Sequence, residues 1–229
     1  VWQLYVKDEN FAVLSEEDAK NFSAQGGEVI FSDPRSPASR ITKRLAAFGD
    51  TALSDQILGI TFNYPAESFF QINLPVYEQS LRDIKTFVDP TKPLVDLYSG
   101  VGTIGLTVGG EQTTLVEINE PAVEEMRRNI TKLGSSAQAV LAASEHALDY
   151  ISTDATIIVD PPRAGLHENV TKKLLEAAPQ RIIYLSCNPV TQARDCQRLS
   201  EQYSIFFNRA YNFFPRTPHI EHLVVLDKI

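Results

Sequence analysis

From Leu94 onward the sequence alternates between short apolar segments and amphipathic ones, which strongly restricts the possible folds. This alternation is typical of a parallel sheet covered by helices on both faces. The predicted strands are Leu94–Leu97, Thr114–Ile118, Gln138–Leu141, Thr156–Val159, Arg181–Ser186, Ser204–Ala210 and His219–Leu226. The predicted helices are Thr103–Val108, Pro121–Leu133, Glu145–Tyr150, Glu168–Ala178 and Pro189–Gln202. Right-handed crossovers followed by a closing hairpin give a seven-stranded, doubly wound α/β sheet.

The part of the chain before Leu94 has a different pattern. Strand-like runs at Trp2–Val6, Phe11–Leu14, Glu28–Phe31 and Ile57–Phe62 predict a small, mostly β domain on the substrate side, over residues 1–73. A linker helix is expected within 74–92, from Leu74 to Phe87, before the proline-rich break that opens the catalytic domain at 93–229. The basic residues Arg35, Arg40, Lys43 and Arg44 are interpreted as a solvated face in preference to an RNA-binding patch.

Composition limits the class of protein. The apolar content of 43% supports a folded core, and the net charge of −8 does not indicate nucleic-acid binding by the chain as a whole. The two cysteines form neither a disulfide framework nor a metal cluster, which suits a reducing cytoplasm. No signal peptide or membrane-spanning run is present, so we expect a cytoplasmic monomer. Because the chain opens on a strand-like segment without Met, we interpret it as the C-terminal part of a longer protein.

A glycine-rich turn closes the first strand of the second domain. Gly100, Gly102 and Gly105 form a G-x-G-x-x-G pattern, which alone is a weak indication of a dinucleotide site. Asp96 lies four residues before the first glycine, where it would repel a pyrophosphate and attract an amine-bearing ligand. Glu117 ends the next strand, where a carboxylate binds ribose hydroxyls. These carboxylates favour S-adenosylmethionine over NAD, although a tight turn that binds nothing has the same pattern.

A cysteine lies between a buried strand and a helix. Cys187 follows the strand ending at Ser186, and Asn188-Pro189 is a typical helix start. The positive end of the helix dipole predicts a stabilised thiolate and hence a nucleophile. The alternative is a small buried apolar side chain, which is the commoner role of a lone cysteine.

A rigid bend follows the strand Thr156–Val159. The consecutive prolines of Asp160-Pro161-Pro162-Arg163 cannot continue a strand, so they would present Asp160 to the sheet edge where ligands bind. A polar residue followed by Pro-Pro also occurs in methyltransferases that hold a planar base. A plain loop that ends a strand is an equally good reading of this motif by itself.

Taken together, these motifs resemble the RNA uracil-5-methyltransferase family, which makes 5-methyluridine in tRNA and ribosomal RNA. The similar segments run from about residue 57 to the end and include Phe70-Gln71-Ile72-Asn73, Asp96 to Gly102, Asp160 to Arg163, Ser186 to Pro189, and Thr217 to Glu221. The resemblance implies a class I, Rossmann-like methyltransferase domain that uses S-adenosylmethionine, with RNA as its partner. It implies that the cofactor or the base is contacted by Gln71, Tyr98, Gly100, Glu117 and Asp160. It also implies that Cys187 is the nucleophile and that Glu221 is the general base. Without the family match, an exposed strand carboxylate would be the better interpretation of Glu221. Many family members carry an N-terminal RNA-binding barrel, and some a four-cysteine iron–sulfur site; neither is present in these residues.

The chemistry of this family explains the residue types. A thiolate that adds to C6 of uracil makes C5 nucleophilic, and a separate carboxylate must then remove the C5 proton. Arg163 is a candidate donor to the developing charge on O4. Two alternatives stay open: cytosine-C5 methylation, with Glu221 protonating N3, and a non-catalytic RNA-binding module with the same fold.

Overall fold

The computed structural model describes residues 1–11, 24–35, 41–66 and 68–229. It contains two compact units, one formed by Val1–Ser54 and Tyr64–Glu67 and the other by Asp55–Asn63 and Ser68–Ile229. In the described part of the chain, no helix has the length and apolarity needed to cross a bilayer.

The smaller unit contains a three-stranded sheet of β1 (Trp2–Val6), β2 (Gly26–Phe31) and β3 (Lys43–Gly49). Strand β2 is central, pairs parallel to β1 and antiparallel to β3, and buries Val29 and Ile30 completely. The mostly β prediction is thus confirmed. The basic stretch is partly strand, however: Arg44 extends from β3 to the buried Glu28, with 2.9 Å between its Nε and Glu28 Oε1. The predicted strand at 12–14 and the side chain of Arg40 lie outside the described residues.

The single strand predicted at Ile57–Phe62 is wrong, because the chain turns within it. Strands β4 (Ala52–Ile57) and β5 (Ile60–Pro65) form a hairpin around Leu58 and Gly59, both of which have positive φ. Gly59 adopts this conformation without strain, and it is the residue that allows the tight turn.

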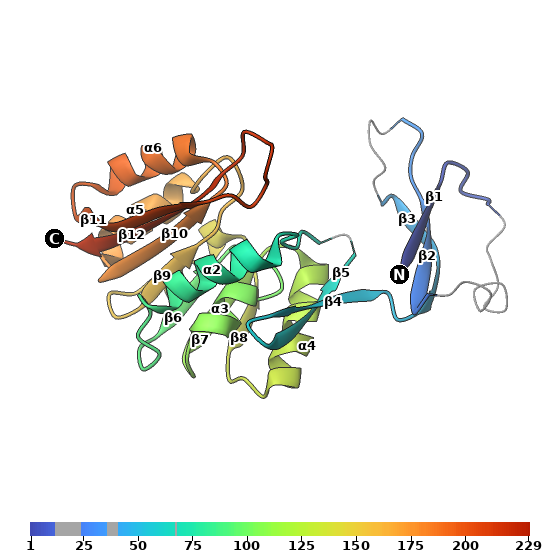
Figure 1. Cartoon of the computed structure of the whole chain (residues 1–229), viewed down its shortest axis with the longest axis horizontal. Helices are drawn as coiled ribbons and strands as arrows, with labels where there is room; N and C mark the ends of the chain where they lie inside the picture. The colour runs from blue at the N-terminus through green and yellow to red at the C-terminus, as the bar shows by residue number, and fades with distance from the viewer. Residues whose placement is uncertain (12–23, 36–40, 67) are drawn as a thin grey trace. The chain divides into compact units, whose positions relative to one another are not determined.

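The larger unit is built on the predicted seven-stranded sheet, which is confirmed (Figure 1). From edge to edge its strands are β11 (Tyr203–Tyr211), β12 (Glu221–Lys228), β10 (Arg181–Ser186), β9 (Thr156–Val159), β6 (Leu94–Leu97), β7 (Thr113–Glu117) and β8 (Gln138–Leu141). All neighbours from β10 to β8 pair in parallel, whereas β12 is antiparallel to both β10 and β11. The C-terminal ends of the parallel strands and the start of β12 therefore share one edge of the sheet.

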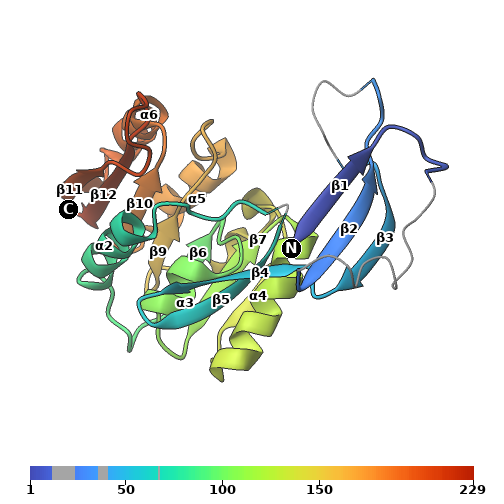
Figure 2. The same ribbon diagram turned by 45° about the vertical axis from the view of Figure 1, so that its right-hand side comes forward.

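Helices cover both faces of this sheet (Figure 2). They are α2 (Leu74–Lys85), α3 (Thr103–Val108), α4 (Glu120–Leu133), α5 (Glu168–Ala177) and α6 (Pro189–Leu199). Alternate residues of one strand enter different cores: Ile157 and Val159 pack with residues of α5 and α6, and Ile158 packs with residues of α2 and α3. Both faces of the inner strands β6, β9 and β10 are buried, which explains their largely apolar sequences.

The α-helix predicted at Glu145–Tyr150 is wrong. Two 3-10 turns, η1 (Ser144–His146) and η2 (Leu148–Tyr150), take its place. Ala147 between them has φ −110° and ψ 28°, which is outside the helical region and prevents one continuous helix. The segment is too short for the helical period to have decided this from the sequence.

Candidate functional site

The predicted glycine turn links β6 to α3 at the functional edge of the sheet. Tyr98, Gly100 and Gly102 have φ of 65°, 55° and 86°, so three backbone positions within five residues are left-handed. A Cβ on Gly100 would meet no atom within 4 Å, so the backbone there is open to a ligand. The Tyr98 phenol interacts with Ser144 and with the backbone of His167. Only the backbone of Tyr98 therefore contributes to the glycine turn.

Glu117 is held against this turn. One of its carboxylate oxygens accepts a hydrogen bond from the Gly100 amide at 2.9 Å. The other accepts from the amides of Ile118 and Asn119 at 2.9 and 2.8 Å. Each carboxylate oxygen keeps further acceptor capacity, so a fixed acceptor pair lies beside the glycine backbone.

Asp96 and Gln71 are buried acceptors with free oxygens. Asp96 is fully buried; its Oδ2 accepts from the Gly105 amide at 2.9 Å, while Oδ1 has no hydrogen-bond partner among the described residues. Burial raises the pKa of Asp96 to about 8, and the nearby carboxylates of Asp160 and Glu117 contribute in the same direction. Gln71 Oε1 is likewise buried without a partner. Buried acceptors without partners are costly, and a ligand that donates hydrogen bonds would satisfy them.

Asp160 follows β9 directly, and its amide donates to the Leu97 carbonyl at 3.5 Å. Burial raises the pKa of this carboxyl to about 7. The acid is therefore close to its titration point at neutral pH, which is the behaviour of a group that exchanges or shares protons at a functional site.

Cys187 and Glu221 lie at the same end of two paired strands. Ser186, the last residue of β10, pairs with His222 of antiparallel β12, so Cys187 follows the final paired residue of β10 and Glu221 is the first residue of β12. Glu221 is only 3% exposed, and burial followed by the charge of Asp160 raises its pKa to about 8.

The prediction of a stabilised Cys187 thiolate is wrong for this structure. Partial burial raises the pKa of the Cys187 thiol, and the charges of Glu221 and Asp160 raise it further. The side chain of Arg163 opposes this rise through its positive charge. The helix start that suggested a low pKa does exist, with Asn188 as N-cap, but the nearby acids and the burial outweigh it.

Arg163 also contacts the segment before Glu221. Its Nη2 lies 3.1 Å from the Nδ1 atom of His219. One cation thus lies beside both the thiol and the acid predicted to react.

Tyr77 is a buried residue near these acids that the sequence reasoning did not single out. It lies on α2 and packs edge-on against Phe213. Burial raises its pKa well above the ordinary value, and the charges of Asp160, Asp96 and Glu221 act on it in the same direction. Its place on the buried face of an amphipathic helix made it look like an ordinary core residue; no other signal was available in the sequence.

The strand order, the glycine turn and the acids at the strand ends define a class I methyltransferase domain. The family model for tRNA (uracil-5-)-methyltransferase matches residues 45–229, which is most of the chain. The chain therefore belongs to the tRNA (uracil-5-)-methyltransferase family.

Individual relatives agree with this assignment. The chain is 36% identical over 182 residues to an uncharacterized RNA methyltransferase of Mycoplasma mobile, covering 77% of this chain and 50% of the relative. It is 37% identical over 193 residues to one of Lactiplantibacillus plantarum, covering 79% and 42%. The structure resembles that of the Pyrococcus abyssi tRNA (uracil-54, C5)-methyltransferase in complex with S-adenosyl-L-homocysteine, with a TM-score of 0.83 and 29% identity over 98% of this chain and 55% of that one. The chain thus spans about half the length of the relatives it matches.

Proposed function

We propose that this chain is the catalytic part of an enzyme that methylates C5 of a uridine in tRNA or ribosomal RNA through a covalent Cys187 adduct. The observation that carries the proposal is that Cys187 and Glu221 directly flank the last paired residues of β10 and β12, Ser186 and His222, and that the charges of Asp160 and Arg163 act on both groups. We further propose that the enzyme acts as a cytoplasmic monomer.

The residues around the glycine turn fit S-adenosylmethionine. The free oxygens of Asp96 and Gln71 suit its ammonium group and other polar hydrogens, and Glu117 suits the ribose hydroxyls. The open backbone at Gly100 and the left-handed Gly102 allow close approach of a ligand. When bound, this cofactor supplies the electrophilic methyl group that C5 takes up.

The protein's own part of the reaction consists of two bond changes at the base. The Cys187 sulfur forms a bond to C6, and the electron pair of the C5–C6 double bond moves toward O4, where Arg163 is the proposed donor. After C5 has gained its methyl group, the Glu221 carboxylate removes the C5 proton. The electron pair left behind restores the double bond as the bond from C6 to sulfur breaks, which returns Cys187 as thiolate.

The test uses RNA that contains 5-fluorouridine, which has no C5 proton to lose. The full-length protein is incubated with this RNA and S-adenosylmethionine. A covalent protein–RNA complex should form and should remain intact in denaturing electrophoresis. Cys187→Ala should abolish the complex, whereas Cys196→Ala should retain it, because Cys196 lies on α6 in the core. Glu221→Gln should instead accumulate an adduct on ordinary uridine RNA.

Three other outcomes of these assays would contradict parts of the proposal. A complex formed only with 5-fluorocytidine RNA would indicate cytosine methylation, and no complex with either RNA would favour a non-catalytic binding module. Normal turnover by Glu221→Gln would contradict the assignment of the base.

A further inference from the structure

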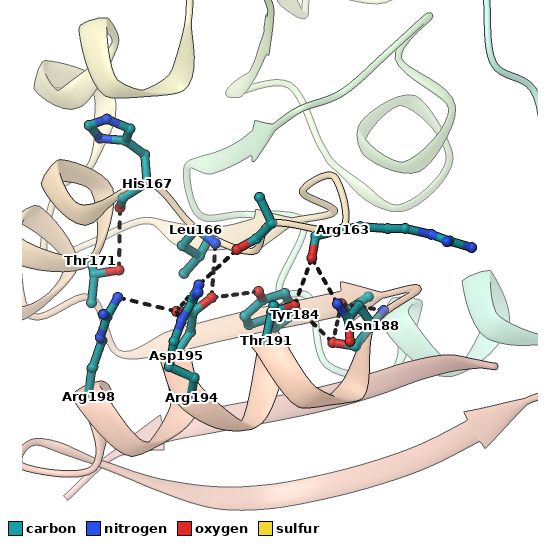
Figure 3. A network of polar contacts seen from close by, with 12 residues as sticks. Arg163, Leu166, His167, Thr171, Tyr184, Asn188, Thr191, Arg194, Asp195 and Arg198 are labelled. Carbon is teal, nitrogen blue, oxygen red and sulfur yellow. Dashed lines mark hydrogen bonds and ion pairs between the residues drawn. The ribbon is translucent and has the colours of Figure 1, made fainter. Parts of the chain in front are cut away.

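The loop that carries Arg163 is attached to the start of α6 (Figure 3). The Arg163 carbonyl accepts two hydrogen bonds, from Asn188 Nδ2 at 2.9 Å and from Thr191 Oγ1 at 3.1 Å. Asn188 directly follows Cys187, so the same turn of chain that places the thiol also holds the backbone of the arginine.

A second attachment lies one turn further along α6. Arg194 donates to the Ala164 carbonyl at 2.9 Å and, through Nε, to Asp195 at 2.9 Å. Asp195 is completely buried, and its Oδ2 accepts from the Leu166 amide at 2.9 Å and from the Tyr184 hydroxyl at 3.0 Å. The loop is thereby joined to both α6 and β10 (Figure 3).

Close packing shows that the loop has little freedom at this place. A Cβ on Gly165 would lie 2.4 Å from Asp195 Oδ2 and 2.6 Å from Arg194 Nη2, and the φ of this glycine is 81°. A buried carboxylate carries a large desolvation cost, which apolar residues of similar volume would avoid. Here the carboxylate is used to fix one backbone segment.

The loop held by these contacts begins with Arg163, whose guanidinium acts on the two proposed reacting groups, the Cys187 thiol and the Glu221 carboxyl. The Arg163 side chain also contacts His219. We propose that Asn188, Thr191, Arg194 and Asp195, together called the α6 clamp, are positioning residues that fix the Arg163 guanidinium against Cys187 and Glu221. The role of the clamp in catalysis depends on the proposed function, but its effect on the thiol does not.

The test compares two arginines of α6 that both approach Asp195. Arg194 reaches the loop, whereas Arg198 lies 3.6 Å from Asp195 Oδ1 and forms no hydrogen bond or ion pair with residues 163–166 in the described part of the chain. Iodoacetamide alkylation of Cys187 is followed against pH in the full chain, with the modified cysteine identified by mass spectrometry. Arg194→Ala should shift the alkylation midpoint to higher pH and slow the reaction at pH 7.5 by about threefold to tenfold, because only the thiolate reacts. Arg198→Ala should leave the profile within about twofold of the wild type.

The pH midpoint distinguishes positioning from simple loss of stability. A merely destabilised protein would expose Cys187 and speed up alkylation, while a displaced Arg163 slows it. Arg194→Lys should restore part of the rate, since an ammonium can still reach Asp195 but cannot make the same forked contact. Thr191→Val, which keeps the side-chain shape, should shift the midpoint in the same direction by a smaller amount, because Asn188 still binds the Arg163 carbonyl.

Failure of the proposed function would be recognised separately. If the wild type forms no adduct with 5-fluorouridine RNA while Arg194→Ala still shifts the alkylation profile, the uridine chemistry is wrong and the clamp stands. Equal alkylation profiles for wild type, Arg194→Ala and Thr191→Val would overturn the clamp, whatever the RNA assay shows. If all three form the adduct equally fast, the clamp has no role in catalysis.

Discussion

Replacing Glu221 by glutamine should make the folded protein more stable at neutral pH while it stops the reaction. Glu221 is 3% exposed, and its pKa in the folded chain is about 8, against an ordinary value of 4.5. Between these two values the unfolded chain has lost the proton that the folded chain still holds, so the stability due to this group falls as pH rises from about 4.5 to about 8. Glutamine has the same shape but does not ionise, so the Glu221→Gln protein should not lose this part of its free energy of unfolding as pH rises.

The size of the effect follows from the two pKa values. At pH 7 the carboxyl costs up to about 3 kcal/mol of the free energy of unfolding, and at pH 5 it costs less than about 1 kcal/mol. For a chain of this length, 3 kcal/mol corresponds to a rise in the melting temperature of about 6–12 °C. Glu221→Gln should therefore gain several degrees at pH 7 and little at pH 5.

Differential scanning calorimetry at pH 5 and pH 7 measures both values. Glu176→Gln, an exposed carboxyl on α5, is the matched control and should change the melting temperature by a degree or so at either pH. A Glu221→Gln protein that gains the same stability at both pH values, or none, would refute the argument that this carboxyl is held against its ionisation.

Two further predictions concern the glycine turn and its acids. Asp96→Asn should weaken binding of S-adenosylhomocysteine at least tenfold by isothermal titration calorimetry, because an amide cannot take up the negative charge that the carboxyl acquires when the ammonium group of the ligand binds beside it. Unchanged affinity would remove Asp96 from the proposed cofactor site. Gly102→Ala should cost about 2 kcal/mol or more in chemical denaturation, since its φ is 86° and the new Cβ would lie 3.0 Å from Leu106 and Leu115. Gly134→Ala, with φ 61° and no atom near the new Cβ, should cost only about 1 kcal/mol, and equal losses would show that packing around Gly102 is irrelevant.

The sheet and its functional edge were accessible from the sequence because strand ends have clear local signals. The apolar run Thr156–Val159 and the prolines after it defined both a strand and the position of Asp160. The Asn-Pro pair after Cys187 likewise marked the start of α6. Such signals depend only on residues that are neighbours in the sequence, so tertiary packing does not change them.

Properties that depend on distant residues were not accessible. Burial raises the pKa of Cys187, and the charges of Glu221 at the start of β12 and of Asp160 after β9 add to this rise, so the shift depends on segments far from Cys187 in the sequence. Tyr77 and Asp195 lie in helical segments, and nothing in the local sequence indicates that both side chains are buried. The burial of these side chains is determined by tertiary packing, which cannot be derived from a single sequence.

The antiparallel placement of β12 has a consequence for biosynthesis. Strands β6, β7, β9 and β10 can associate as they leave the ribosome, but Glu221 belongs to the last strand of the sheet to be translated. A nascent chain thus holds an exposed thiol without its carboxylate partner. On the proposed chemistry, an unfinished polypeptide could bond covalently to a pyrimidine but could not release it, and such a dead-end complex would persist until β12 had joined the sheet.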